Sequence, residues 1–293
     1  MKKLLVIVNP AAGRGRAHRH WQETARRLIE AGIAFDEAAT SRPLEALAIA
    51  EKEARNYASI VAAGGDGTVH EVVNGLMRAG AGTAFGVIPL GSGDDFAKLL
   101  SKDFISSFPG AKTKAFDAGR IVSGSNVRYF ANGMDIGFGA HGARNVALVP
   151  RFLTGFGAYL GALALTMVRY PLLQVRLQLD DAPPFTQTTA MTAVMNGTTF
   201  GGSFHVCPEA RPDDGLLDLL LVGPVGRLEI LQLAPKILRG THAGDPRLRM
   251  LRAKRVTIES DEPLLVEADG EIAFRDACRL EIDLLPGALR VFS

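Results

Sequence analysis

The chain has 293 residues, 47% of them hydrophobic and 22% charged, which is ordinary for a globular protein and is enough for two domains. The formal net charge of +2 is too small to indicate a nucleic-acid partner, and we expect none. The two cysteines, Cys207 and Cys278, belong to no CxxC or Cys–His pattern. We therefore assign them no chemistry and expect reduced, packed thiols in a cytosolic protein.

The N-terminal segment predicts a buried strand over residues 3–8, and residues 9–13 form a loop at the carboxyl end of this strand. Open α/β sheets bind ligands at that end. Arg14 and Arg16 follow in the same loop, either as solvated charges or as phosphate contacts.

A helix is predicted next, with one apolar face and Gly32 as its end; the face consists of Trp21, Ala25, Leu28 and Ile29. Residues 33–39 predict a second strand. Thr40 to Pro43 then resemble a helix start, in which Thr40 would serve as a cap.

A glycine loop at residues 64–68, with the sequence Gly-Gly-Asp-Gly-Thr, lies between a predicted strand at 59–63 and a helix that follows. The helix is indicated by apolar residues at i, i+3, i+4 and i+7, namely Val69, Val72, Val73 and Leu76. Glycines let a ligand approach the backbone, and helix N-termini bind phosphate. Asp66 would repel a phosphate unless a cation lies between them, which suggests Mg²⁺. A tight turn capped by Asp66 explains the same residues.

A second glycine loop at residues 89–97 follows a predicted strand at 84–88 and opens another predicted helix. The repeated order of strand, loop and helix predicts a parallel sheet with helices on both faces.

From about residue 117 the pattern changes to extended runs that alternate apolar with polar residues, which predicts a second, mostly antiparallel β domain of two packed sheets. Strands are expected within 120–130, 173–179, 188–196, 216–222, 255–260, 264–268 and 280–284. A helix is predicted over 225–238, with a kink at Pro235 and its end at Gly240. The glycine-rich segments 133–140 and 196–203 are expected to be turns.

Residues 152–168 carry no charge and are flanked by Arg151 and Arg169. The run is slightly shorter than the ~18 residues usual for a spanning helix, so we predict a buried or lipid-facing helix instead.

Two acidic segments are candidates for chemistry. The carboxylates of residues 208–218 suit a hard cation or a polar turn. Asp269-Gly270-Glu271 follows an apolar strand and is either a hairpin turn or an acid/base pair.

These motifs together resemble the diacylglycerol kinase catalytic family, which includes sphingosine, ceramide and bacterial lipid kinases. Residues 64–68 resemble its GGDGT signature, of which NAD kinases carry the related GGDG, and residues 9–13 resemble its NPxxG motif. Residues 89–97 resemble its P-L-G-T-x-N-D-F-A segment, with Ser92 for the usual Thr and Asp94 for the usual Asn. The resemblance continues in the family's order through the glycine segments and Asp269-Gly270-Glu271 to the terminal strand.

The resemblance implies an α/β plus all-β fold: an N-terminal Rossmann-like α/β domain with a parallel sheet, as in NAD and diacylglycerol kinases, and a C-terminal antiparallel β-sandwich. Residues 1–117, joined by the returning segment 284–293, would bind the nucleotide. Residues 118–283 would bind the lipid and carry catalytic groups.

The resemblance also implies the site residues. ATP is expected to contact Asn9, Thr40, Gly64, Gly65, Asp66, Gly67, Thr68, Glu71 and Ser92. Asp66, with Asp95 and Asp117, would organise Mg²⁺, and a structural Mg²⁺ would be held by the Asp214 side chain and the carbonyls of Arg211 and Leu216. The catalytic residues would be Glu271, Asp269 and Asp66, with Glu271 preferred as base. The Asp269–Glu271 turn is expected to face the 64–68 loop across an interdomain cleft.

The implied function is an ATP-dependent lipid kinase that phosphorylates a primary hydroxyl of a lipid such as diacylglycerol, in phospholipid biosynthesis. It would be cytoplasmic and peripheral to the inner face of the membrane. Contact with an anionic bilayer would come from residues 146–170 and from the basic run Arg247, Arg249, Arg252, Lys254 and Arg255, which a solvated strand face explains equally well. The resemblance does not specify which lipid is phosphorylated, which nucleotide is preferred or whether the protein forms a homodimer.

Two alternatives remain. The first is an NAD kinase-like enzyme, which the segments 213–215 and 269–271 disfavour. The second is a nucleotide-binding regulator without turnover, supported only by the altered residues 91–95.

Overall fold

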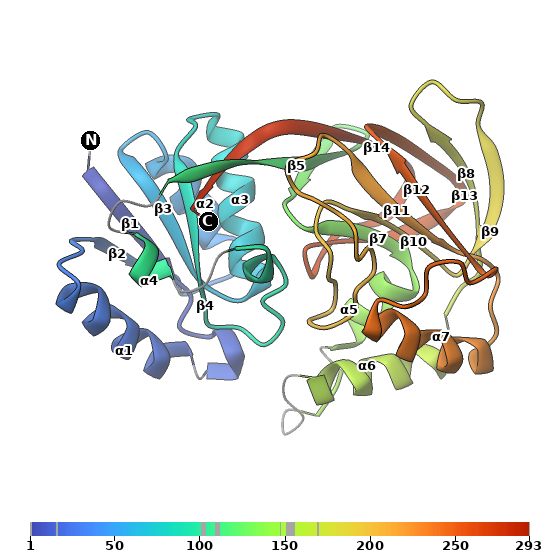
Figure 1. The fold of residues 1–293 in the computed structure, drawn as a ribbon, viewed down its shortest axis with the longest axis horizontal. Helices are drawn as coiled ribbons and strands as arrows, with labels where there is room; N and C mark the ends of the chain where they lie inside the picture. The colour runs from blue at the N-terminus through green and yellow to red at the C-terminus, as the bar shows by residue number, and fades with distance from the viewer. Residues whose placement is uncertain are drawn as a thin grey trace. The chain divides into compact units, whose positions relative to one another are not determined.

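The computed structural model describes residues 2–15, 17–100, 104–108, 112–146, 148–150, 156–168 and 170–292. The chain forms two compact units, Met1–Phe116 with Pro286–Ser293, and Asp117–Leu285 (Figure 1). It passes between them twice, in strands β5 (Thr113–Ser123) and β14 (Glu271–Phe292). Arg16, residues 151–155 and Arg169, together with the side chain of Arg14, lie outside the described part of the chain.

The first unit contains a parallel sheet in the strand order β2-β1-β3-β4-β14. Its strands are β1 (Lys2–Val8), β2 (Asp36–Ala39), β3 (Tyr57–Gly64), β4 (Ala84–Pro89) and the end of β14. The central strands are apolar and buried along most of their length, as a parallel sheet covered on both faces requires. The predicted parallel sheet is confirmed, although β2 begins three residues later than the predicted 33–39.

Helices lie on both faces of this sheet, with α1 on one side and α2 and α3 on the other (Figure 1). The helical elements are η1 (Ala12–Gly15), α1 (Ala17–Glu30), α2 (Glu45–Glu53), α3 (Asp66–Ala79), η2 (Phe96–Leu99) and α4 (Phe104–Ser107). Trp21 and Leu28 pack with Val6 and Val61, but Ile29 is 67% exposed, so its predicted burial is wrong. Leu28 already occupies the buried face, and the next residue is turned about 100° away from it. The helix predicted after the second glycine loop is only the single 3₁₀ turn η2.

The second unit is mostly antiparallel β structure. Its strands are β5, β6 (Asn126–Phe130), β7 (Gly133–Gly137), β8 (Leu173–Leu179), β9 (Phe185–Thr189), β10 (Met191–Met195), β11 (Leu217–Val222), β12 (Leu248–Ala253), β13 (Arg255–Ala268) and β14. The first part of β13 pairs with β8 and its last part with β7. Irregularities between Glu259 and Glu267 interrupt its pairing with β14. Such bulges bend a strand, which lets β13 take part in both layers of a sandwich.

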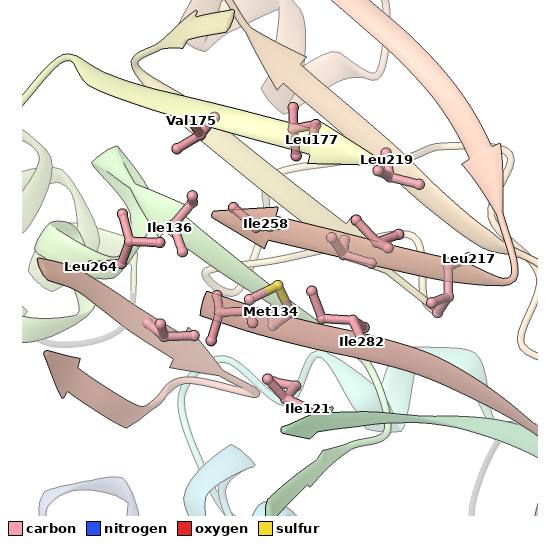
Figure 2. Close-up of a cluster of buried hydrophobic side chains, with 14 of the residues drawn as sticks. Ile121, Met134, Ile136, Val175, Leu177, Leu217, Leu219, Ile258, Leu264 and Ile282 are labelled. Carbon is pink, nitrogen blue, oxygen red and sulfur yellow. The ribbon is translucent and has the colours of Figure 1, made fainter. Parts of the chain in front are cut away.

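The core of this unit lies between the layers. Side chains of β7 and β11 meet those of β8, β13 and β14 in one apolar cluster (Figure 2). Met134, Ile136, Leu177, Ile258 and Ile282 are among its fully buried members. The predicted fold class, a Rossmann-like α/β domain with a C-terminal antiparallel β-sandwich, is confirmed.

The described part of the second unit contains three helices: α5 (Phe138–Val146), α6 (Phe156–Val168) and α7 (Arg227–Arg239). The turn predicted at 133–140 is instead strand β7 and the start of α5. The strand predicted at 188–196 is divided at Ala190, because β9 pairs with β8 whereas β10 pairs with β7 and β11. Cys207 is buried as expected, but Cys278 is exposed, because its neighbour Ala277 takes the inward position on β14.

Candidate active site

Asp66 joins the two glycine loops. It is the first residue of α3, and only Gly65 separates it from the end of β3. Its carboxylate accepts hydrogen bonds from the backbone N–H groups of Asp94 (2.8 Å) and Asp95 (2.7 Å). Burial, followed by the negative charges of Asp95 and Asp94, raises the pKa of Asp66 to about 7. The two loops, predicted separately from the sequence, therefore form one structure with Asp66 at its centre.

The glycines of these loops are required by close packing. A Cβ atom on Gly64 would lie 2.2 Å from Thr68 Oγ1, and one on Gly91 would lie 2.5 Å from the Cα of Gly65. The backbones of the two loops can touch at Gly65 and Gly91 only because Gly91 has no side chain, and the Thr68 side chain can pack on Gly64 for the same reason. Gly67 lies in the first turn of α3, where a helix leaves N–H groups without intrahelical acceptors. Phosphate binding by these residues stays a prediction.

Asn9 and Thr68 meet at the carboxyl ends of β1 and β3. Asn9 Nδ2 donates to Thr68 Oγ1 (3.1 Å), and its backbone N–H donates to the carbonyl of Ala63 (2.9 Å). Thr40 follows β2 at the same edge, and its hydroxyl donates to the carbonyl of Val8 (3.3 Å). The structure thus gathers these predicted nucleotide contacts along one edge of the sheet.

Glu71 caps a neighbouring helix. Its Oε1 accepts from the N–H of Leu44 (2.9 Å) and its Oε2 from the N–H of Ala46 (3.0 Å). Helix α2 therefore begins at Glu45, later than the helix start predicted at Thr40 to Pro43. Since both carboxylate oxygens already accept backbone hydrogen bonds, a nucleotide contact by Glu71 would have to share them, and it stays a prediction.

The departure at Asp94 has a structural explanation. Asp94 has φ +52°, in the left-handed region that Asn and Asp tolerate best among residues with a side chain. Its Oδ1 accepts from the N–H of Gly91 (3.2 Å), an interaction that an Asn side-chain oxygen could also make. Ser92 is exposed in the same loop. An Asn at this position could therefore adopt the same backbone conformation and accept the same hydrogen bond.

Asp269 and Glu271 have different surroundings. Asp269 is 6% exposed, and its carboxylate accepts three backbone hydrogen bonds, from Ala131 (3.0 Å), Asn132 (2.9 Å) and Gly133 (3.1 Å). Glu271 is exposed at the start of β14. Asp269 is thus committed to holding two chain segments together, whereas Glu271 can reach a ligand. Asp66 and these residues belong to different units, and the expected cleft between them stays a prediction.

Two buried acids near this turn were not predicted as site residues. Asp135 on β7 and Glu267 on β13 are cross-strand neighbours, and neither side chain is exposed. Burial raises the pKa of Asp135 to about 8, an effect that the nearby Ala140 amide only partly offsets. Burial and the Asp135 charge also raise the pKa of Glu267 well above its usual range. The available signal was the presence of a Glu between Val266 and Ala268 in an otherwise apolar run.

The predicted cation loop is tied together by hydrogen bonds. Asp214 Oδ1 accepts from the N–H of Leu216 (3.1 Å), and Asp117 Oδ2 accepts from the N–H of Gly215 (2.9 Å). Arg252 Nη1 lies 4.0 Å from Asp214 Oδ2. Among the described residues, no group of three or more His, Cys, Asp or Glu could hold a metal. A cation here would depend on Asp214 and the carbonyls of Arg211 and Leu216, oxygen donors that suit Mg²⁺, and it stays a prediction.

The basic run at 247–255 is largely neutralised by ion pairs. Arg247 pairs with Asp245, Arg252 with Asp218 and Arg255 with Asp181. Arg249 lies over the Phe185 ring, 5.0 Å from its centroid. Within the described ranges, the structure contains no helix long and apolar enough to cross a bilayer.

Comparison with known proteins gives matches along nearly the whole chain. Residues 3–122 match the diacylglycerol kinase catalytic domain, and residues 135–293 match the YegS C-terminal NAD kinase beta sandwich-like domain. A diacylglycerol kinase of Bacillus subtilis is 28% identical over 284 residues, which cover 92% of this chain and 90% of the relative. A "probable lipid kinase YegS-like" of Chromohalobacter salexigens is 33% identical over 256 residues, covering 82% and 77%. The crystal structure of a diacylglycerol kinase from Bacillus anthracis has the same fold, with a TM-score of 0.75 at 22% identity over 99% of this chain and 96% of that one.

Proposed function

The chain belongs to the diacylglycerol kinase catalytic-domain family of lipid kinases, which are phosphotransferases, and from this premise we propose that it transfers the γ-phosphoryl group of ATP to a primary hydroxyl of a lipid such as diacylglycerol. The observation that carries the proposal is the pair of glycine loops joined through Asp66 at the carboxyl ends of β3 and β4. We assign nucleotide binding to the first unit, and lipid binding with the catalytic base to the second.

The nucleotide site is assigned to the edge of the parallel sheet at which Asn9, Thr40, residues 64–68 and Ser92 lie. Ligands of open α/β sheets bind beyond the carboxyl ends of the strands, and the N-terminus of α3 favours a phosphate. Mg²⁺, when bound, would supply the positive charge that lets phosphates approach the carboxylates of Asp66 and Asp95.

Glu271 is the proposed base. As the lipid oxygen forms its bond to the γ-phosphorus, the bond from phosphorus to the bridging oxygen breaks, ADP leaves, and Glu271 accepts the hydroxyl proton. The exposed position of Glu271 supports this role, and the three backbone amides on Asp269 support a positioning role for that residue. A cation at residues 211–216 would be structural.

Membrane contact is assigned to an apolar surface at α6 and α7. Leu165, Val168 and Leu172, at the end of α6 and just after it, are 43%, 67% and 49% exposed. Leu228 and Leu231 of α7 are 75% and 54% exposed, and Arg227 ties the start of α7 to the carbonyl of Val168 (2.6 Å). Large exposed apolar patches favour a membrane or a protein partner. We prefer this surface to the basic run, whose charges are mostly paired, for peripheral contact with the cytoplasmic face of a membrane.

The test is transfer of label from γ-³²P-ATP in the presence of Mg²⁺ to a panel of diacylglycerol, monoacylglycerol, phosphatidylglycerol, a sphingoid base and NAD. We expect label in a lipid with the wild type and strongly reduced label with Asp66→Asn or Glu271→Gln. The matched control is Glu262→Gln, which changes an exposed glutamate of β13 and should leave transfer intact.

Two results would contradict the proposal. Label on NAD alone would assign the protein to the NAD kinase-like alternative. Binding of ATP without transfer to any acceptor would favour a regulator without turnover.

A further inference from the structure

A pair of carboxyl groups lies in the second unit beneath helix α5, outside the residues assigned to phosphoryl transfer. Asp135 and Glu267 are directly opposite each other on antiparallel strands β7 and β13. Their neighbours Met134 and Ile136 point into the apolar core (Figure 2), and Val266 and Ala268 belong to the same core cluster. Because side chains alternate along a strand, both carboxyl groups point to the opposite face, where α5 contacts both strands.

Helix α5 is shaped to admit these groups. A Cβ atom on Gly139, in the first turn of α5, would lie 1.6 Å from Asp135 Oδ2, so any other residue would exclude the carboxyl group from this position. Cross-strand neighbours have Cβ atoms about 5 Å apart, which lets two carboxyl groups reach each other.

The surroundings disfavour two negative charges. Among the described residues, no group has hydrogen-bonding geometry to either oxygen of Asp135 or to Oε2 of Glu267, and the nearby Ala140 amide only partly offsets the effect of burial on the pKa of Asp135. The titratable groups on the packed elements are Asp269 and Glu271 from the adjacent turn, and His141 and Arg144, which contact each other on α5 (3.0 Å). Two unpaired buried charges would be strongly unfavourable, whereas a single proton shared between the two groups satisfies two of these oxygens.

The pair is also connected to the proposed base. Glu267 Oε1 accepts a hydrogen bond from the N–H of Gly270, the residue between Asp269 and Glu271. The position of this oxygen therefore helps to fix the turn from which Glu271 projects.

We propose that Asp135 and Glu267 share one proton in a carboxyl–carboxylate hydrogen bond, and that Glu267 thereby acts as a positioning residue for Glu271 through the Gly270 amide. The second clause rests on the proposed function of Glu271. When the shared proton is lost to solvent, the two charges repel each other, the Glu267 carboxylate shifts, and the turn loses its support.

Kinase activity tests the positioning role through kcat measured against pH. We expect kcat of the wild type to decrease at alkaline pH. In Glu267→Gln this decrease should be absent, because Gln keeps an oxygen for the Gly270 amide and does not titrate. Glu267→Ala should lower kcat by about 10²-fold with little change in KM for ATP, because a displaced base impairs the chemical step. Rescue by Gln but not by Ala supports positioning. An alkaline decrease in Glu267→Gln identical to that of the wild type, or equal losses in Gln and Ala, would overturn it.

Unfolding tests the shared proton without any activity. The unfolded chain loses these protons near pH 4, whereas the folded Asp135 keeps its proton up to about pH 8, so the free energy of unfolding should fall as pH rises across this window. Asp135→Asn should reduce that fall in the unfolding temperature. An unchanged pH dependence in Asp135→Asn would refute the shared proton. If Glu271→Gln stays active, the base assignment fails, yet the unfolding result still decides whether the proton is shared.

Discussion

The substitutions Asp269→Asn and Glu271→Gln each replace one carboxylate oxygen by an NH₂ group. We expect the first to lower the stability of the protein and the second to lower its kcat. Asp269→Asn keeps one acceptor oxygen but directs an NH₂ group at a backbone N–H that now has no acceptor. Asn tolerates the φ of +50° at this position, so the backbone itself is not strained by the change.

The hydrogen bonds of Asp269 set how much Asp269→Asn should lower the free energy of unfolding. The carboxylate accepts three backbone N–H groups and is 6% exposed, so at least one buried donor is left unsatisfied. Such a loss costs about 1–3 kcal/mol, with the upper half expected for a charged acceptor. For a protein of this size, about 2–3 kcal/mol corresponds to a decrease in Tm of roughly 3–5 °C.

Glu271→Gln should behave in the opposite way. Because its side chain is exposed, we expect a stability change within about 0.5 kcal/mol, and a decrease in kcat of about 10²–10⁴-fold if it is the base. Thermal unfolding and steady-state lipid phosphorylation would be measured on both variants. An Asp269→Asn protein as stable as the wild type would refute the reasoning, as would a Glu271→Gln protein that keeps its kcat.

Two further predictions concern the first unit. Glu71→Ala removes the acceptor for two backbone N–H groups at the start of α2 and should lower the free energy of unfolding in urea by about 1–2 kcal/mol. The stability of Glu71→Gln should lie between those of Glu71→Ala and the wild type. Equal stability of all three proteins would contradict the capping role. In EDTA, the raised pKa of Asp66, about 7, means that the folded state retains a proton that the unfolded chain loses near pH 4. The free energy of unfolding should therefore fall as pH rises from about 4 to 7, by up to about 4 kcal/mol, and this part of the fall should vanish in Asp66→Asn. An identical pH dependence in the variant would exclude Asp66 as its source.

The position of Asp66 changes the interpretation of the glycine loop. From the sequence, its carboxylate required either a cation beside a phosphate or a helix-capping role. In the structure it accepts hydrogen bonds from the loop after β4, 28 and 29 residues further along the chain. A cation remains compatible with this arrangement, since each carboxylate oxygen has a second lone pair.

Local patterns in the sequence were sufficient for much of this protein. The apolar runs of β1, β3 and β4, each followed by a glycine or proline loop, predicted the parallel sheet and the edge on which the candidate nucleotide residues lie. The alternation in residues 173–179 predicted the antiparallel unit in the same way. Burial of one or both faces of a strand imposes these patterns on residues that are close in sequence.

The roles of individual side chains depended on partners distant in sequence, which only the tertiary structure identifies. Glu71 caps a helix that begins 26 residues before it, and Asp269 holds amides 136 to 138 residues away. The sequence shows Glu267 only as a Glu within an apolar run, and its burial opposite Asp135 is seen only in the structure. Polar groups removed from water must find partners wherever the folded chain presents them, and the spacing of residues along the sequence carries no record of that pairing.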